Sequence, residues 1–593
     1  MCGIVGYIGE REAAPLLYNG LLRLEYRGYD SAGIAAIDSS DNVCVRKDVG
    51  KIKEINEKQN LEDMSGNVAI SHTRWCTHGK VTKENAHPHT CCTGKIAVVH
   101  NGIIENNAEL RKELEDKGHP FKSETDTEVV PHLIEESMKH GKTFKDAVFE
   151  TTKKLQGSYA VLAISSNEPD KIIAVRHQSP LIIGVNGENK EYFIASDATP
   201  FLEHTKSAFF MDDGDMAVLT RKGAEFYNHG EKIDKKTNKI EWSMEDASKD
   251  GHPHYLIKEI YDQPLVLQAT MAQDVKKLQK AAHMINAASR VAIVACGTSR
   301  HASLVGRYVI SELSGKYCEV YMASEFQYFA DKLGKDTLII AVSQSGETAD
   351  VLVPVREAKK LGCKVISLVN VVGSSLDRES DLSFYLNCGP EISVASTKAF
   401  TSQLVVFYLL AYTMAYDLDN GKKLLNTLPD KISETIKSCE PKIKELAQKL
   451  RDKDDVYYIA RGENFAVATE GALKLKEISY MHAEGMPAGE LKHGTLALIE
   501  KGTPVVVICP TDYTYNETIS NIEEAKARGA FVIGISNKPN KVFDMWLQTP
   551  ETPTLFYPLL ANIPCQLLAY HLAVARGTDV DQPRNLAKSV TVK

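Results

Sequence analysis

The spacing of apolar residues divides the chain into two parts with different patterns, which meet near residue 240. In the first part, short apolar runs of strand length are separated by turn residues, with a few stretches of helical spacing. The strand-like runs include residues 4–8, 68–71, 97–100 and 160–164, and the helical stretches include 13–26 and 105–117. Because strands and helices do not alternate regularly, this pattern predicts stacked, largely antiparallel sheets.

A polar, lysine-rich stretch at residues 228–251 reads as a linker, and beyond it strands, loops and helices alternate. That alternation predicts parallel sheets covered by helices. The second part also repeats itself, because residues 291–297, 337–342 and 357–366 correspond to 456–462, 503–508 and 524–533, at offsets of 165, 166 and 167. A near-constant offset predicts two tandem α/β domains descended from one and packed as a pseudo-symmetric pair.

The composition of the chain is that of a soluble globular protein. The chain has 593 residues, 43% of them hydrophobic and 25% charged, with a net charge of −8, which is typical of a soluble globular protein and gives no surface for nucleic acid. Apolar runs such as 404–410 are too short to cross a membrane, so no membrane partner is expected. Twelve scattered cysteines without a C-x-x-C motif, and no signal segment, indicate reduced thiols in a cytoplasm.

Cys2 is the most informative single residue, because it follows Met1 directly. Removing Met1 would leave a thiol and a free α-amine on one residue, and an N-terminal amine can act as the base that activates a nucleophile. Its ordinary pKa of about 8 leaves much of it neutral near physiological pH. The alternative is that Cys2 only begins a buried strand.

A candidate phosphate loop, Ser343-Gln-Ser-Gly-Glu-Thr348, follows an apolar strand and precedes a helix at 349–361. Hydroxyls and backbone N–H groups at the start of a helix form an anion site. The loop contains no lysine and lacks the ending of a nucleotide-binding loop, so it suits a monophosphate. The alternative is a simple helix cap. Cys296-Gly-Thr-Ser299 repeats the same strand-to-helix arrangement.

Acid and base groups gather in the second copy of the repeat. Glu470, Lys474 and Glu477 are spaced to share one face of a helix. Such a row is often only a solvated set of ion pairs. Here His482 and His493 follow closely, and carboxylate, lysine and histidine together suit proton transfer beside a sugar carbonyl.

A further cluster of histidines and cysteines raises the question of a metal. Its members are His72, Cys76, His78, His87, His89, Cys91 and Cys92. The spacing matches no standard zinc pattern, so we expect no metal site.

Taken together, these motifs closely resemble the glutamine–fructose-6-phosphate aminotransferase (isomerising) family over the whole chain. The motifs of the first part, which resemble a class II (Ntn-type) glutamine amidotransferase, are Cys2-Gly-Ile-Val-Gly6, the stretch 24–33, His72-Thr-Arg-Trp75, Thr77-His-Gly79, His100-Asn-Gly102 and the stretch 123–128. Those of the second part, which resemble two sugar isomerase (SIS) domains, are Cys296-Gly-Thr-Ser299, the loop 343–348, Val394-Ala-Ser-Thr-Lys398, the stretch 470–477 and the tail 581–588.

The resemblance implies a fold class and a division into domains. It implies an α/β multidomain chain with an Ntn-type αββα sandwich followed by two doubly wound parallel domains. The expected ranges are 1–240 for the glutaminase domain, 241–255 for the linker, 256–425 and 426–580 for the SIS domains, and 581–593 for a tail over the sugar site.

The resemblance also implies roles for residues of the first site. Cys2 would attack the side-chain amide of glutamine, and Asn101 and Gly102 would form the oxyanion hole, where a single donor is typically worth about 3 kcal/mol. Residues matching glutamine-binding positions are Arg74, Trp75, Thr77, His78 and Asp126. Released ammonia would pass through an internal channel to the sugar site.

At the second site, Lys588 would form an imine with the open-chain ketose, Glu477 would move the proton between C1 and C2, and His493, from a neighbouring subunit, would open the ring. Lys474 and Glu470 would support this acid–base chemistry. Residues matching sugar-phosphate contacts are Thr298, Ser299, Ser343, Gln344, Ser345, Thr348, Val394 and Ser396.

The implied enzyme makes glucosamine 6-phosphate and glutamate from fructose 6-phosphate and glutamine, the first step of hexosamine synthesis, as a homodimer without an external cofactor. Two alternatives are a related amidotransferase acting on another sugar phosphate and a sugar-phosphate sensor. Five positions depart from the family pattern: Cys76, Arg300, His301, Gly485 and Thr495.

Overall fold

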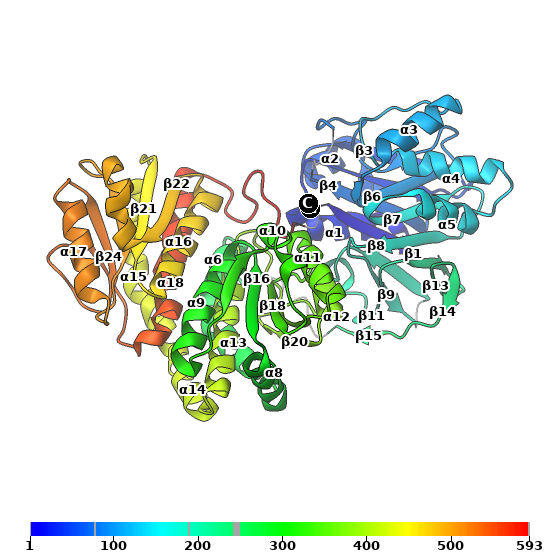
Figure 1. The fold of residues 1–593 in the computed structure, drawn as a ribbon. Helices are drawn as coiled ribbons and strands as arrows, with labels where there is room; N and C mark the ends of the chain where they lie inside the picture. Colours follow the sequence, from blue (N-terminus) through cyan, green and yellow to red (C-terminus); the bar gives the residue numbers. More distant parts are fainter. Residues whose placement is uncertain (1, 76–78, 188–189, 241–248, 591–593) are drawn as a thin grey trace. The chain divides into compact units, whose positions relative to one another are not determined.

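The structure is a computed structural model that describes residues 2–75, 79–187, 190–240 and 249–590. Its contacts divide the chain into two compact units, Met1–Ala247 with Ser589–Lys593, and Ser248–Lys588 (Figure 1). Each unit is described below by itself.

Unit 1 contains two antiparallel sheets. The first runs in the order β15 (Asn238–Lys239), β11 (Ser207–Phe210), β9 (Ile182–Asn186), β10 (Glu191–Ala195), β1 (Gly3–Ile8), β4 (Val68–Arg74), β2 (Ser31–Ile37), β3 (Val43–Val49). The second runs in the order β14 (Glu231–Ile233), β13 (Gly223–Asn228), β12 (Asp215–Thr220), β8 (Ile172–His177), β7 (Gly157–Ser165), β6 (Ile96–Ile104), β5 (His89–Thr90).

The two sheets of unit 1 pack face to face and are covered by helices on their outer sides. One apolar core joins Ile4 of β1 and Ile70 of β4 to Val99 of β6 and Leu162 of β7. Separate cores lie between the first sheet and α1, and between the second sheet and α3 to α5. The helices are α1 (Ala13–Leu24), α2 (Ile52–Gln59), α3 (Asn107–Asp116), α4 (Val129–Lys139) and α5 (Phe144–Lys154). The expected αββα sandwich of antiparallel sheets is therefore confirmed.

Two local expectations for this unit were wrong. The helix expected at 13–26 ends at Leu24, and a short 3₁₀ turn, η1 (Glu25–Arg27), follows it. The stretch 228–251, expected to be only a linker, contributes β14 and β15. Both strands lie at sheet edges, where a polar, lysine-rich sequence is common because charged residues discourage further pairing.

Unit 2 contains two parallel sheets with the same strand order, as the repeat predicted. The sheets are β17 (Glu319–Met322), β16 (Arg290–Ala295), β18 (Thr337–Ser343), β19 (Lys364–Val369), β20 (Leu382–Tyr385), and β22 (His482–Pro487), β21 (Asp455–Ala460), β23 (Pro504–Ile508), β24 (Phe531–Ser536), β25 (Met545–Gln548). In each sheet the chain order reverses beside the first strand, and ligands of such folds bind at the carboxyl ends of the strands on either side of that point.

The helices of unit 2 flank these sheets (Figure 1). They are α6 (Tyr255–Tyr261), α7 (Gln263–Met271), α8 (Val275–Ala287), α9 (Gly297–Ser314), α10 (Ala323–Phe326), α11 (Ala349–Lys360), α12 (Ser375–Glu379), α13 (Lys398–Met414), α14 (Leu418–Leu425), α15 (Leu428–Leu450), α16 (Asn464–Ser479), α17 (Tyr515–Lys526) and α18 (Tyr557–Arg576).

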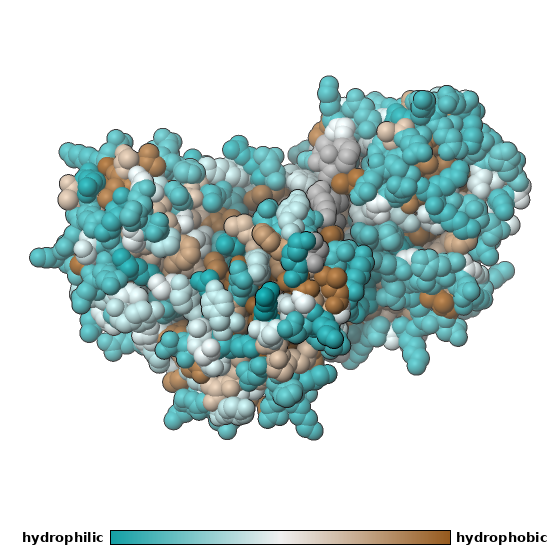
Figure 2. Space-filling view, viewed as in Figure 1, coloured by the Kyte–Doolittle hydropathy of each residue, from teal (hydrophilic) through white to brown (hydrophobic). Residues whose placement is uncertain are grey.

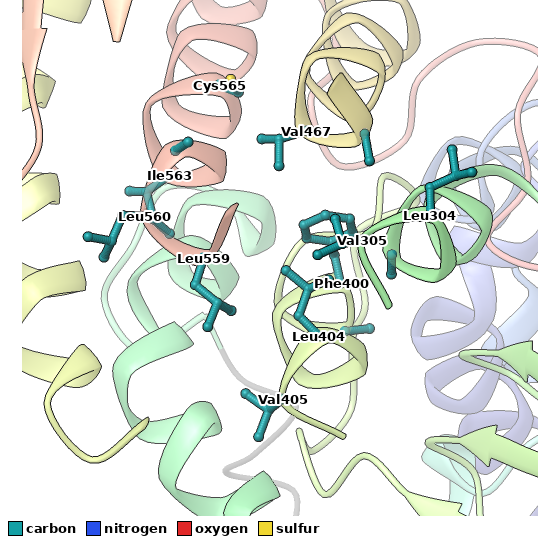
Figure 3. Close-up of a cluster of buried hydrophobic side chains, with 14 of the residues drawn as sticks. Leu304, Val305, Phe400, Leu404, Val405, Val467, Leu559, Leu560, Ile563 and Cys565 are labelled. Carbon is teal, nitrogen blue, oxygen red and sulfur yellow. The ribbon is translucent and has the colours of Figure 1, made fainter. Parts of the chain in front are cut away.

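One apolar core spans both halves of unit 2. Figure 3 shows side chains of α9 and α13, from the first half, meeting side chains of α16 and α18, from the second, with Val305, Phe400, Val467 and Leu559 among them. Every residue of α13 is buried, which explains why its sequence is apolar all round. The two halves of unit 2 therefore share one core.

Helix α18 and the residues before it, Thr554–Arg576, are long and apolar enough to cross a membrane, which the sequence analysis did not expect. Most of this segment is buried against α15 and α16, as in the core helix of a soluble protein. On the face seen in Figure 2, hydrophilic residues cover most of the surface and hydrophobic ones are scattered among them.

The polar tail after α18 has no regular secondary structure but is tied to unit 2. The carboxylate of Asp581 accepts hydrogen bonds from the backbone N–H groups of Tyr255 (3.0 Å) and Leu256 (2.9 Å) at the start of α6. The backbone N–H of Arg584 donates to the hydroxyl of Tyr480, and its guanidinium lies 4.3 Å from the centre of that ring. These contacts fix the path of the segment that leads to Lys588.

Candidate active sites

In unit 1, Cys2 lies directly before β1 and beside the end of β4. The backbone N–H of Trp75 points to the Cys2 sulfur at 3.3 Å, and the sulfur lies 3.4 Å from the Trp75 carbonyl oxygen. Burial raises the pKa of the Cys2 thiol, while the Trp75 N–H and the charge of Arg74 oppose that rise. A thiol held in this way needs a nearby base to become a nucleophile.

Strand β6 brings Asn101 to Cys2. Its amide nitrogen donates to the Cys2 carbonyl oxygen (3.1 Å) and to the hydroxyl of Ser196 (2.8 Å), and its amide oxygen lies 3.0 Å from Nε2 of His72. Burial lowers the pKa of His72 to about 3, so its ring is neutral. The neutral ring can donate from Nε2, which fixes the orientation of the Asn101 amide.

Gly102, the next residue of β6, requires glycine. Its φ is +124°, and a side-chain Cβ there would lie 1.9 Å from the carbonyl oxygen of Ser158. Two residues on, the backbone N–H of Ile104 donates to Asp126 at 2.8 Å. The buried Asp126 carboxylate is therefore held to the same strand as Asn101 and Gly102.

Arg27 also touches Cys2, and the sequence analysis gave it no role. Its Nε donates to the Cys2 carbonyl oxygen at 3.3 Å, and its Nη1 forms an ion pair with Asp197 at 3.0 Å. Asp197 also accepts a short hydrogen bond from Tyr26. Arg27 lies in the quoted motif at 24–33, but no sequence spacing links that motif to Cys2. Thr77 and His78, together with the departure Cys76, lie outside the described residues.

In unit 2, two of the predicted sugar-phosphate segments meet at the point where strand order reverses. Strands β16 and β18 are neighbours in parallel register, with Ala295 opposite Val342. The segment 296–299 and the loop 343–348 therefore leave the same edge of the sheet. Ser299 faces α13, where its hydroxyl accepts a hydrogen bond from Gln403 (2.9 Å).

The loop 343–348 is a tight turn closed by its own hydroxyls. Ser343 and Thr348 share a hydrogen bond of 2.9 Å, and the backbone N–H groups of Gly346 and Glu347 donate to Ser343 and Ser345. Gly346 has a φ of +65°, and a Cβ there would lie 2.0 Å from Oγ of Ser374. Thr348, which precedes α11, makes no side-chain capping bond to the first turn of that helix. The bonds are therefore those of the turn itself, and the phosphate-site and helix-cap interpretations both stay predictions.

The loop is also linked to the segment after β20. Asn370 donates from its side chain to the Gly389 carbonyl (2.7 Å) and from its backbone to the Gln344 carbonyl (2.9 Å). The segment 391–399, described below, starts two residues after Gly389.

Three predicted acid–base residues lie in one row on α16, and Thr298 from the first half completes what we call the Lys474 cluster: Glu470, Lys474, Glu477 and Thr298. The Lys474 ammonium lies 2.5 Å from Glu477, 3.4 Å from Glu470 and 3.0 Å from the Thr298 hydroxyl, which in turn donates to Glu470 (3.0 Å). Lys474 and Glu470 are fully buried, so this row is not a solvated face.

The charges of the Lys474 cluster depend on each other. Burial opposes the charge on Lys474, but Glu470 and Glu477 outweigh it and raise its pKa. Burial raises the pKa of Glu477, against the effect of Lys474 and Lys588. A carboxyl with a raised pKa beside a fixed ammonium is suited to accept and return a proton.

Lys588 is brought into the same region by the tail. Its side chain is only 7% exposed, and its ammonium lies 2.5 Å from Glu391. Glu391 also accepts from the Ser396 hydroxyl (2.8 Å) and from the backbone N–H groups of Thr397 and Ala399. The backbone N–H of Val394 donates to the Asp581 carbonyl at 3.0 Å. The segment 391–399 thus holds both the tail and Lys588.

Two buried carboxyls here were missed by the sequence analysis. Burial would raise the pKa of Glu391, but Lys588 and the hydrogen bonds outweigh it and lower that pKa. Burial and the charge of Glu391 raise the pKa of Glu259, on α6, to about 7. Neither residue stands in a periodic pattern or beside a glycine loop, so nothing in the sequence singled them out.

His493 and the departure His301 differ in their positions. His493 is exposed on η6 (Ala488–His493), and within the described residues no hydrogen bond or ion pair joins it to the Lys474 cluster. His301 lies on α9 with its Nδ1 2.8 Å from Glu470. The unusual residue at 301 therefore contacts the Lys474 cluster directly.

Comparison with known families agrees with this two-part organisation. A family model described as "SIS domain" matches residues 284–413 and 449–576, and one described as "Glutamine amidotransferase domain" matches residues 72–203. The C-terminal domain of glucosamine-fructose-6-phosphate aminotransferase from Francisella tularensis, a solved structure, aligns with a TM-score of 0.51 and 37% identity, covering 56% of this chain and all of that one.

Curated relatives match over their full length. A protein of Thermococcus kodakarensis named glutamine–fructose-6-phosphate aminotransferase (isomerizing) is 48% identical, with 100% of both chains covered. A protein of the same name from Clostridium tetani is 46% identical over 100% of both chains. The chain therefore belongs to the glutamine–fructose-6-phosphate aminotransferase (isomerising) family.

Proposed function

We propose that this enzyme converts fructose 6-phosphate and glutamine to glucosamine 6-phosphate and glutamate. The observation that carries the proposal is the row of Glu470, Lys474 and Glu477, the first two fully buried, in the same unit as the buried side chain of the tail lysine, Lys588. An amine beside a proton-transferring carboxyl is what a ketose needs to become an amino-aldose.

In unit 1, the proposed reaction releases ammonia from glutamine. The Cys2 sulfur attacks the side-chain amide carbon, and the α-amine of Cys2, freed by removal of Met1, carries the proton to the leaving nitrogen. Water then hydrolyses the thioester to glutamate. The Asn101 amide and the Gly102 N–H would stabilise the oxyanion, while Arg74 and Asp126 would hold the carboxylate and ammonium of the substrate.

In unit 2, the proposed reaction installs that ammonia on the sugar. The loop 343–348 and Thr298 bind the phosphate. Lys588 condenses with the C2 carbonyl and releases water, and ammonia then displaces the lysine from C2. Glu477 moves a proton from C1 to C2, which leaves an amine on C2 and an aldehyde at C1. The water released here balances the water used in glutamine hydrolysis.

Ring opening of the sugar requires a further group, and we propose His493 of a second copy of the chain. His493 is exposed and is not joined to the Lys474 cluster of its own chain within the described residues. A homodimer would supply His493 from one copy to the sugar site of the other.

The first prediction concerns the overall reaction and Cys2. With glutamine that carries heavy nitrogen in its amide, mass spectrometry should find the label in a hexosamine phosphate. Cys2→Ala should slow this transfer more than about a thousandfold, because the nucleophile is gone, while isomerisation of fructose 6-phosphate continues. Cys44→Ala, which removes an exposed thiol from β3, is the control and should have no effect. Label transfer by the Cys2→Ala enzyme would contradict the proposal.

The second prediction concerns Lys588. Borohydride added with fructose 6-phosphate should trap a covalent adduct on Lys588, identified by peptide mass spectrometry. Lys588→Arg should abolish synthesis and the adduct but leave glutamine hydrolysis, because a guanidinium stays protonated and cannot form the imine. Lys541→Arg makes the same change at an exposed lysine between β24 and β25 and should keep both activities. A Lys588→Arg enzyme with near-normal synthesis would refute the role given to the tail.

The third prediction concerns the loop 343–348. Thr348→Val removes a hydroxyl donor and should weaken fructose 6-phosphate binding by about 1.5–3 kcal/mol, the usual cost of losing a hydrogen bond to a charged group. That is roughly 10- to 150-fold in Kd by calorimetry. Thr337→Val is the matched control, because the Thr337 hydroxyl, at the start of the strand that leads into the loop, is buried without a hydrogen-bond partner among the described residues. Equal affinity of the two variants would return the loop to a helix-capping role.

The fourth prediction concerns the shared site. His493→Gln and Lys588→Arg should each be inactive in synthesis. Mixing them under conditions that exchange subunits should restore synthesis, because one site of a mixed dimer then has both native residues. Mixing Glu477→Gln with Lys588→Arg is the control and should restore nothing if one chain supplies both groups. Failure of the first mixture in a verified mixed dimer would place His493 outside the site.

A further inference from the structure

Four side chains converge in unit 1 away from Cys2. We call Cys92, His119, His132 and Glu135 the Cys92 cluster; one potential metal-binding atom from each lies within 4.8 Å of all the others. They come from three segments: the turn between β5 and β6, the connection after α3, and helix α4. Three of them are buried, and Cys92 is the most exposed.

Three of the distances between donor atoms are close to those around a tetrahedral zinc ion. The Cys92 sulfur lies 3.1 Å from Nδ1 of His119 and 3.3 Å from Nδ1 of His132. Nδ1 of His119 lies 3.4 Å from Oε2 of Glu135. With usual zinc–ligand bonds of about 2.0 to 2.3 Å, a tetrahedron places neighbouring donor atoms about 3.3–3.6 Å apart. Small shifts would therefore complete a four-coordinate site.

Each histidine turns its other nitrogen toward a carboxylate. Nε2 of His119 lies 3.1 Å from Glu136, within hydrogen-bond distance, whereas Nε2 of His132 lies 3.7 Å from Glu128 and forms no hydrogen bond among the described residues. Metal-binding histidines almost always donate their second N–H to such a partner, which fixes the ring with its free lone pair toward the metal. Lys139 lies 3.4 Å from Nε2 of His119 and 3.5 Å from Glu136, outside the four donor atoms.

Hydrogen bonds within the described residues do not fully satisfy the cluster. A thiol has one proton, so Cys92 cannot donate to both histidines. Oε2 of Glu135 is buried without a hydrogen-bond partner, while its other oxygen accepts from the backbone N–H (3.0 Å) and hydroxyl (2.7 Å) of Thr93. Three carboxylates, those of Glu128, Glu135 and Glu136, surround the two rings, so a cation at the centre would relieve their repulsion.

We propose that the Cys92 cluster binds a Zn²⁺ ion as a closed structural site. One thiolate, two imidazoles and one carboxylate form a donor set that zinc accepts, and four protein ligands leave no open position for catalysis. The ion would cross-link the β5–β6 turn to α4. Glu128, beside His132, accepts hydrogen bonds from the backbone of Lys122 and Ser123, so the ion would also support the loop that carries Asp126.

This proposal replaces the sequence-based expectation of no metal. Of the histidines and cysteines considered in the sequence, only Cys92 belongs to the proposed site. His72 and His87 stack in a different place, with ring centres 4.0 Å apart, and His89 meets His87 edge-on at 4.7 Å. Cys92 instead pairs with histidines 27 and 40 residues further along the chain, a spacing outside the standard zinc patterns.

The test measures metal in the untagged full chain. The protein is stripped with a chelator, loaded with zinc sulfate, dialysed and analysed by atomic emission; about one zinc per chain should remain. Loading with Co²⁺ instead should give the intense visible bands of a tetrahedral site and a near-ultraviolet thiolate band. Zinc below a tenth of an equivalent in the native sequence would overturn the proposal without any variant.

Variants identify the ligands. Cys92→Ser should abolish the thiolate band, and Cys92→Ser with His132→Gln should lower retained zinc at least tenfold. Cys91→Ser is the matched control, because Cys91 is the neighbouring thiol and bonds Thr93 (3.3 Å) rather than the two histidines. It should keep both signals. A thiolate band that survives Cys92→Ser, or is lost equally in both single variants, would contradict the assignment.

Discussion

The packing of α16 against α9 and α18 is the constraint on which the rest of unit 2 depends. It buries the apolar faces of both SIS halves in one core, and it carries Lys474 into that core between two carboxylates and the Thr298 hydroxyl. An ion that is taken out of water loses several kcal/mol of solvation free energy, and only close, well-oriented partners offset that loss. The helix interface therefore fixes where the acid–base groups can be.

The sequence predicted the architecture well because architecture follows from repeated local patterns. The near-constant offset in unit 2 predicted two equivalent halves, and both sheets have the same strand order. The candidate phosphate loop and the α16 row stood out in the sequence because their members lie within one turn or one helix. Such local patterns can be recognised without knowing which distant residues they contact in the fold.

Long-range partners could not be found in the same way. Arg27 reaches the Cys2 carbonyl, and Glu391 reaches Lys588 across 197 residues, through contacts that no spacing encodes. Lys588 itself came only from resemblance, because a polar tail predicts a solvated end. The Cys92 cluster shows the same limit: histidines that lie apart in sequence meet only after α3, α4 and the β5–β6 turn have packed.

The pseudo-symmetry of unit 2 also allows equivalent positions of its two halves, on α9 and α16, to be compared. At the offset of 165 that aligns Gly462 with Gly297, Glu470 and Lys474 correspond to Val305 and Val309 of α9, which are both fully buried. In a fully symmetric pair, the loop after the first strand of each half would contact the helix of the other half in the same way, as Thr298 contacts α16 here. In this chain α16 has an ion pair at these two positions, whereas α9 has hydrocarbon side chains there. The two halves of unit 2 thus share one fold, but only α16 carries a buried lysine–carboxylate pair at these positions.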